Sequence, residues 1–312
     1  PRASGSWTFS AFAGRTTGVL DLDRRRQLFS TMSAFVFGND RQHYLQRDGA
    51  RVALARQGLK LRWQLAWRHQ LESPRVTTAT WNLTRSPIEV EENFPATRGR
   101  NSELQLGGSL RPLRWPLWIE ADSRLGTGAA FGYRRLRVNA GADVPLARWA
   151  TLLPQASWGV LDGDVAPQNA FWLGGPSSMR SLPPYAAAGD RLLFGRLELV
   201  IARDLVAPLR LPRTSALNLQ PTLFVASGAA WGADPFGGPG TAVAAWPQAV
   251  AWHHELGVGF YYRPGMPEPE GFFRITYAHP LGANDDGGRL SVSYSLPLDQ
   301  LRTRRLRLSR QG

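Results

Sequence analysis

The chain has 312 residues, of which 43% are hydrophobic and 20% are charged, a balance that excludes a disordered protein and suits one large domain or two ordinary ones. Cysteine is absent, so disulfide frameworks, zinc–thiolate sites and thiol catalysis are excluded. The formal net charge is +13, but most of the arginines are scattered among apolar residues, which argues against nucleic-acid binding.

The sequence shows neither a transmembrane helix nor a signal peptide. No run of roughly eighteen apolar residues occurs, so we expect no transmembrane helix. Residues 1–14 lack the basic start, apolar centre and small-residue cleavage site of a signal peptide. Because the chain opens on Pro1 without an initiator methionine, we expect it to be a piece of a longer polypeptide.

Apolar and polar residues alternate with a period of two along most of the chain, which predicts β-strands. The candidate strands lie near residues 6–16, 27–38, 50–56, 59–70, 88–95, 102–111, 116–125, 131–145, 149–161, 192–204, 217–231, 252–263, 271–281 and 288–298. Within residues 59–68, for example, Trp63 and Leu65 alternate with Arg62 and Gln64. Each such strand has one apolar and one polar face.

Three observations decide which of the two faces looks inward. The segments are long compared with the strands of soluble proteins, which average about 5–6 residues. Charged residues stand at strand centres, where a wide aqueous lumen accommodates them: Arg62, Glu120, Asp122, Arg137 and Glu198. Aromatic residues stand near strand ends, as interfacial girdles require: Trp7, Trp67, Trp158, Trp231, Trp252 and Tyr262.

A transmembrane barrel therefore fits the pattern better than a soluble β-sandwich does. We expect residues 1–298 to form one closed antiparallel transmembrane β-barrel in the outer membrane of a Gram-negative bacterium. Bacterial single-chain barrels have an even number of strands, which gives about 14–16 here. A basic tail, residues 299–312, follows the last strand.

Motifs of catalysis are absent, so we expect no enzyme activity and no cofactor. The sequence contains no G-x-S-x-G elbow, H-E-x-x-H pair or phosphate-binding loop. His253 and His254 are neighbours on a strand and point to opposite faces, which disfavours a shared metal ion. Glu120 and Asp122 share a face, and with Arg124 nearby they predict an ion-pair ladder in the lumen rather than an acid–base pair.

One long segment, about residues 162–191, separates two predicted strands and has an unusual composition. It contains "WLGGPSSMRSLPPYAAAGD", residues 172–190, in which Arg180 is surrounded by small residues, prolines and glycines. A flexible surface loop usually carries several polar residues, and a buried loop does not usually carry an unpaired guanidinium. The composition therefore raises the question of what surrounds Arg180.

This segment resembles the signature loop of the BamA/TamA-type outer-membrane assembly factors and two-partner secretion transporters, the bacterial surface antigen superfamily. Their loop carries "lGGp.s.RGy", then "GD" and a strand with "lE". The matching residues here are Gly174, Gly175, Arg180, Gly189, Asp190 and Glu198. "FRITYAHPLG" and "GRLSVSYSLPL" resemble the last two strands of these barrels, so the resemblance covers residues 170–298.

The resemblance implies that the loop enters the lumen and that Arg180 anchors it to Glu198, which lies on the polar face of its strand. Two departures concern this loop. Ser181 and Leu182 replace the glycine and the aromatic residue that follow the arginine. Ala226 stands where the family has a second acidic partner, so we expect a weaker or rewired anchor.

The resemblance also implies a function, the insertion or translocation of polypeptides through a weakly paired seam between the first and last strands. The implied partners are outer-membrane lipids, unfolded outer-membrane or secreted polypeptides, and POTRA repeats upstream. Two alternatives stay open: a barrel that anchors or exports a fused hydrolase domain, and a pore for small solutes. The basic tail after the last strand weakens the case for a C-terminal assembly signal.

Overall fold

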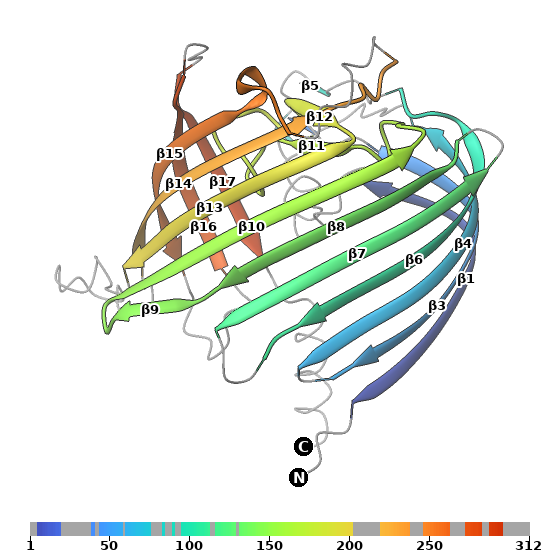
Figure 1. Ribbon diagram of the computed structural model, residues 1–312, viewed down its shortest axis with the longest axis horizontal. Helices are drawn as coiled ribbons and strands as arrows, with labels where there is room; N and C mark the ends of the chain where they lie inside the picture. Colours follow the sequence, from blue (N-terminus) through green and yellow to red (C-terminus); the bar gives the residue numbers. More distant parts are fainter. Residues whose placement is uncertain are drawn as a thin grey trace.

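The computed structural model is an all-β molecule (Figure 1). It describes residues 5–19, 39–40, 44–58, 60–75, 83–84, 89–90, 95–112, 116–128, 131–201, 219–237, 246–262, 272–282 and 287–295. In this part of the chain, no helix is long and apolar enough to cross a membrane.

One antiparallel sheet of 13 strands contains nearly all of the described structure. In order across the sheet, its strands are β1 (Ser6–Val19), β3 (Tyr44–Gln57), β4 (Leu61–Pro74), β6 (Gly99–Leu110), β7 (Leu117–Gly128), β8 (Tyr133–Ala142), β10 (Ala150–Gly163), β13 (Arg191–Ile201), β14 (Leu219–Trp231), β15 (His253–Tyr262), β16 (Phe272–Pro280) and β17 (Arg289–Ser295). The short strand β9 (Val144–Ala147) pairs with the beginning of β10. Each strand pairs with its neighbours along the chain, which is the up-and-down order of a transmembrane barrel.

Two smaller pairs and one helical turn complete the described structure. A hairpin of β11 (Phe171–Leu173) and β12 (Ala187–Gly189) lies beside β13 and β14 (Figure 1). Strands β2 (Asn39–Asp40) and β5 (Glu89–Val90) pair in parallel away from the large sheet. A single 3-10 turn, η4 (Ala249–Ala251), precedes β15.

The predicted all-β barrel fold is confirmed in its main features, with two differences in detail. The strand expected over 88–95 is described only in part, and its residues Glu89–Val90 pair with β2 instead of entering the large sheet. The strand expected over 131–145 is split at Asp143, whose amide donates to the carbonyl of Pro116, into β8 and β9. The strand expected at 27–38 lies outside the described residues.

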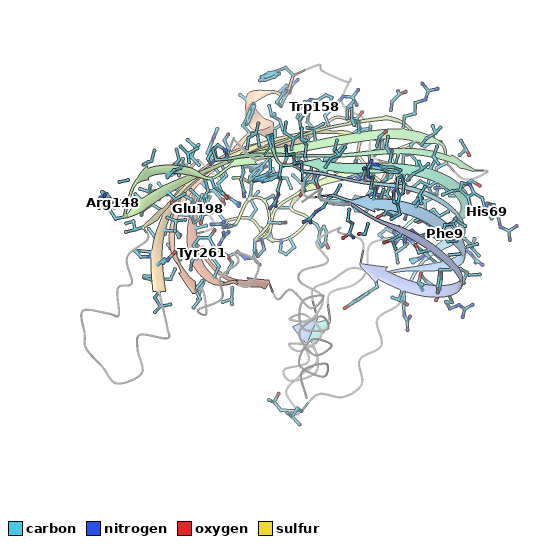
Figure 2. All side chains as sticks on the ribbon, turned by 90° about the horizontal axis from the view of Figure 1, so that it is seen from below. Phe9, His69, Arg148, Trp158, Glu198 and Tyr261 are labelled. Carbon is cyan, nitrogen blue, oxygen red and sulfur yellow. The ribbon has the colours of Figure 1, made fainter. Side chains whose placement is uncertain are left out.

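The sheet curls into a trough whose two outer strands are β1 and β17 (Figure 2). Among the described residues, no pairing joins β1 to β17. The sequence predicted a closed barrel of about 14–16 strands. The described sheet forms the wall of such a barrel. Its two edge strands, β1 and β17, are not paired with each other in the described residues; the place between them is here called the seam.

The convex face of the sheet is apolar and exposed. Its outward side chains include Trp7, Phe9, Leu54, Leu65, Trp67, Leu104, Leu106, Leu125, Trp158, Leu197, Leu223, Val225, Leu256, Val258 and Leu290. Figure 2 shows Trp158 on this convex side and Glu198 on the concave side. An apolar band of this kind faces lipid in an outer-membrane barrel, while the polar face lines the lumen.

The connections between strands differ in length at the two ends of the sheet. At one end they are long, over residues 20–43, 75–98, 164–190 and 232–252. At the other end most are short, as over residues 58–60 and 111–116. Outer-membrane barrels have short periplasmic turns and longer extracellular loops, so residues 164–190 start from the extracellular end.

Candidate functional site

The loop formed by residues 164–190, here called the lumenal loop, folds as a hairpin against the concave face of the sheet. Phe171 pairs with Gly189 and Leu173 with Ala187, which brings both ends of the loop together at β13. Between them, the Ser178 hydroxyl accepts a hydrogen bond from the Gly174 amide at 2.9 Å and donates one to the Gly174 carbonyl at 3.0 Å. A short hydrogen-bonded turn therefore presents the following residue, Met179, and then Arg180.

Glycine is required at two positions of this hairpin. Gly174 has a φ of 120°, and a Cβ added there would lie 2.1 Å from the carbonyl oxygen of Pro183. Gly189 packs so closely on β14 that a Cβ would lie 2.1 Å from the carbonyl oxygen of Trp231. Both glycines allow a backbone approach that no larger residue permits.

Asp190, at the end of the loop, is hydrogen-bonded to β10, the strand that precedes the loop. The Leu161 amide on β10 donates to the Asp190 carbonyl at 2.8 Å. The Asp190 carboxylate lies 3.6 Å from the guanidinium of Arg191, and burial raises its pKa above the ordinary aspartate value. Asp190 therefore lies at the base of the loop and, among the described residues, forms no ion pair with Arg180.

Arg180 is fully buried inside the sheet. Its Nη2 atom lies 3.0 Å from Oε2 of Glu198 on β13, and its guanidinium lies 4.2 Å from the ring centroid of Phe224 on β14. Glu198 also lies 3.6 Å from the guanidinium of Arg274 on β16. The lumenal loop thus brings its arginine into contact with two neighbouring strands, β13 and β14.

A second carboxylate reaches the same turn from β15. Oε2 of Glu255 accepts a hydrogen bond from the Ser181 amide at 2.7 Å, and Oε1 lies 4.0 Å from the Arg196 guanidinium. The Arg196 guanidinium also donates to the carbonyl of Ser178. Glu255 is fully buried and stands directly across from Ala226 in the strand register.

Glu255 is the residue that sequence reasoning missed. The family pattern places the second acid at Ala226, and here the acid comes from the next strand at the paired position. The alternation along residues 253–262 already places Glu255 on the polar face of its strand, and this was the signal that could have found it. In the structure it lies opposite the small side chain of Ala226. Glu255 thus contacts the turn of the loop from the position paired with Ala226.

Apolar packing accompanies these charges. Phe171, Leu173 and Met179 of the loop join Leu161 and Phe194 of the wall in one buried cluster. Leu182, which replaces the family's aromatic residue, packs against this cluster. Burial of apolar surface on both sides of the charged residues excludes water and strengthens their electrostatic interactions.

The other half of the concave face carries a polar ladder of its own. Its ion pairs and hydrogen bonds join Arg47 to Glu72 at 3.1 Å, Arg68 to Glu103 at 2.8 Å, Gln105 to Asp122 at 2.5 Å and Arg124 to Asp122 at 2.6 Å. Asp122 and Arg124 belong to the ion-pair ladder that the sequence predicts in the lumen, and they form an ion pair in the structure. Glu120 is exposed and makes no ion pair within the described part of the chain.

The two adjacent histidines lie on opposite faces of β15, as their strand position predicts. His254 faces outward, and its Nδ1 atom lies 2.9 Å from the hydroxyl of Ser227. In the described ranges, no group of three or more metal-ligating side chains occurs.

The comparisons with known proteins identify the fold. No protein-family model matches the chain, and no curated protein matches it. BamA from Haemophilus ducreyi, in a structure lacking POTRA domains 1–3, superposes with a TM-score of 0.51 at 13% identity over 82% of this chain and 54% of that one. CdiB from Escherichia coli superposes with a TM-score of 0.50 at 13% identity over 82% of this chain and 46% of that one.

The protein therefore has the barrel fold of BamA and CdiB, an integral outer-membrane fold. The chain spans about half the length of each of these two solved chains.

Proposed function

We propose that this chain is the barrel of an outer-membrane factor that inserts or translocates polypeptides. The observation that carries this assignment is the lumenal loop, held by its buried Arg180 in a barrel of the BamA and CdiB fold. The role is one of transport and involves no chemical step. Its clients are unfolded outer-membrane or secreted polypeptides, and its upstream partners are periplasmic POTRA repeats.

The position of the anchor supports a coupling between the loop and the seam. The charged groups that hold the loop come from β13, β15 and β16, and β16 pairs directly with the last described strand. A loop that changes its position would therefore reach β16, the neighbour of the last described strand, through Glu198 and Arg274. Coupling of this kind needs an element with two arrangements, and we propose that the loop is this element, with its ion pairs made in one arrangement and broken in the other.

The edges of the sheet support a route for client strands. In the described structure β1 and β17 pair on one side only, so each presents backbone amides and carbonyls on the other. An unpaired edge binds an additional strand by β-augmentation. Trp7 and Phe9 are exposed on the lipid side of β1, where they offer an apolar surface to a client strand.

Site-specific photocrosslinking in cells tests this assignment. A photoreactive phenylalanine analogue replaces Phe9 on β1, and the matched control replaces Leu125, an outward residue in the middle of the sheet on β7. We expect adducts with newly made outer-membrane or secreted polypeptides from position 9 and none from position 125. No adduct at either position, or equal adducts at both, would contradict the assignment.

The same preparation distinguishes the two alternatives. A solute pore would show large, steady conductance in planar bilayers and no polypeptide adducts. A barrel that anchors a fused hydrolase would crosslink at position 9 only to its own upstream domain. Mass spectrometry of the adducts separates this outcome from crosslinks to many different clients.

A further inference from the structure

Two arginines face each other on the concave wall of the sheet. Arg124 on β7 and Arg135 on β8 are directly opposite in the antiparallel register. Side chains in such a pair have Cβ atoms about 4.5–5.5 Å apart, and like charges placed there are destabilising. The two residues are only 8% and 7% exposed, so water screens their repulsion poorly.

Arg135 differs from the other deeply buried arginines. Arg124, Arg180 and Arg196 each have a carboxylate within salt-bridge distance, from Asp122, Glu198 and Glu255 respectively. Arg135 has no such carboxylate partner in the part of the chain that the structure describes. Its Nε atom, like those of Arg180 and Arg196, has no hydrogen-bond acceptor. A buried cation without a counter-ion is costly unless something supplies the missing charge.

The carboxylates that interact with the neighbouring Arg124 are already engaged. Asp122 accepts bonds from Arg124 and from Gln105. Glu103 pairs with Arg68 at 2.8 Å and accepts a hydrogen bond from the hydroxyl of Tyr133. The wall around Arg135 therefore has an excess of positive charge.

Another arginine and an aromatic ring lie next to Arg135. Arg137, two residues further along the same face, stands opposite Asp122 in the register, and its Nε donates to the side chain of Asn139 at 3.1 Å. The ring of Phe171, from the lumenal loop, lies 4.4 Å from the Arg135 guanidinium carbon. A ring that stacks on the face of a guanidinium leaves the in-plane N–H groups able to donate to an anion.

We infer that Arg135, with Arg124 beside it, binds an oxyanion on the lumen wall, either a carboxylate or a phosphate group. Guanidinium groups bind both of these with paired, charge-assisted hydrogen bonds. The anion neutralises the excess charge and offsets the repulsion between the two arginines. Because Phe171 belongs to the loop, the site is formed where the loop meets the wall.

A phosphate titration of the folded full chain in detergent micelles tests this site. Tryptophan fluorescence gives the Tm as inorganic phosphate replaces chloride at constant ionic strength. Arg135→Gln removes the cation, and Arg62→Gln is the matched control, since Arg62 is an exposed arginine on the same concave face. We expect phosphate to raise the Tm by about 3 °C in the native chain and in Arg62→Gln, and by less than about 1 °C in Arg135→Gln.

Without phosphate, Arg135→Gln is expected to have a higher Tm than the native chain, because it removes an uncompensated buried charge. If this variant does not fold, as judged by its heat-dependent gel mobility, Arg135→Met replaces it with the same expected result. An equal phosphate effect with and without the Arg135 cation would overturn the site.

A short peptide of glutamates, compared with the same peptide of glutamines, identifies the source of the anion. Stabilisation by the glutamate peptide alone indicates a polypeptide carboxylate, and stabilisation by phosphate alone indicates a free or lipid-borne phosphate. Stabilisation by both leaves a general oxyanion site, and stabilisation by neither overturns it. None of these outcomes affects the photocrosslinking test of the polypeptide-handling function.

Discussion

Arg180 and Glu198 place opposite charges in a site from which water is excluded. Breaking a buried ion pair typically costs about 3–5 kcal/mol, because one charge is left without a partner. Glu198 has a second cation, Arg274, at 3.6 Å, which compensates part of that loss. The free energy of the pair is therefore shared among three residues, and single substitutions underestimate the coupling between them.

A double-mutant cycle measures the Arg180–Glu198 coupling. Arg180→Ala is expected to lower the free energy of unfolding by about 2–4 kcal/mol and to leave the barrel folded. Combined with Glu198→Ala, the effects should be non-additive by more than about 1 kcal/mol. Denaturant unfolding in detergent, followed by tryptophan fluorescence, gives these values, and additive effects would show that the two residues do not act as a pair.

Glu255 holds the turn that carries Arg180 through the Ser181 amide. Arg180 is fully buried, so trypsin does not reach the bond after it while the turn is in place. Glu255→Ala is expected to increase cleavage after Arg180 at least several-fold, and Glu255→Gln less, since glutamine still accepts the amide hydrogen bond. Mass spectrometry of the fragments is the measurement, and equal protection in all three chains would exclude this role.

At the level of elements, the hairpin of β11 and β12 depends on close contact with β14. Gly189 meets the backbone of Trp231, and backbone atoms cannot move aside as a flexible side chain can. The loop is therefore positioned by backbone fit as well as by charge. Substitution of this glycine separates the two contributions, because it leaves all of the ion-paired residues in place.

Gly189→Ala is expected to lower the free energy of unfolding by about 2 kcal/mol or more, or to displace the loop and expose Arg180 to trypsin. Gly195→Ala is the matched control, since a Cβ at Gly195 would lie 3.9 Å from its nearest neighbour, the carbonyl oxygen of Gln155. The control should change the stability by no more than about 0.5 kcal/mol. Similar effects of both substitutions would show that the contact with Trp231 is unimportant.

At the level of the whole molecule, the lumenal loop occupies the concave side of the sheet against β13, β14 and β15. Its apolar residues are buried in one cluster with the wall, and its arginine contacts β13. A barrel with its lumen occupied in this way should conduct little. Conductance therefore tests the proposed polypeptide-handling function against an open solute pore.

Planar-bilayer recordings of the reconstituted chain test this property. The native chain is expected to show low conductance with brief openings, and Arg180→Ala to open at least several-fold more often, because the loop leaves the lumen more readily. The control is Arg62→Gln, which changes a lumenal charge away from the loop. Large, steady currents that Arg180→Ala does not alter would instead support a solute pore.

The sequence by itself determined the class of fold. The alternation of residues such as Trp63 and Leu65 with Arg62 and Gln64 depends only on the two-residue period of a strand, which local chemistry fixes. The same parity placed Glu198 on the lumenal face and Asp122 beside Arg124. The glycines and Arg180 of the loop could be found because they form a continuous motif.

Only the tertiary structure shows which residues of neighbouring strands stand opposite each other and which of them contact the loop. Glu255 is far from Arg180 in sequence, and only the pairing of β14 with β15 places it opposite Ala226 and against the turn. The register of β7 and β8 likewise places Arg124 opposite Arg135. Alternation predicts the face of a side chain, but register and loop insertion depend on long-range packing that no local pattern encodes.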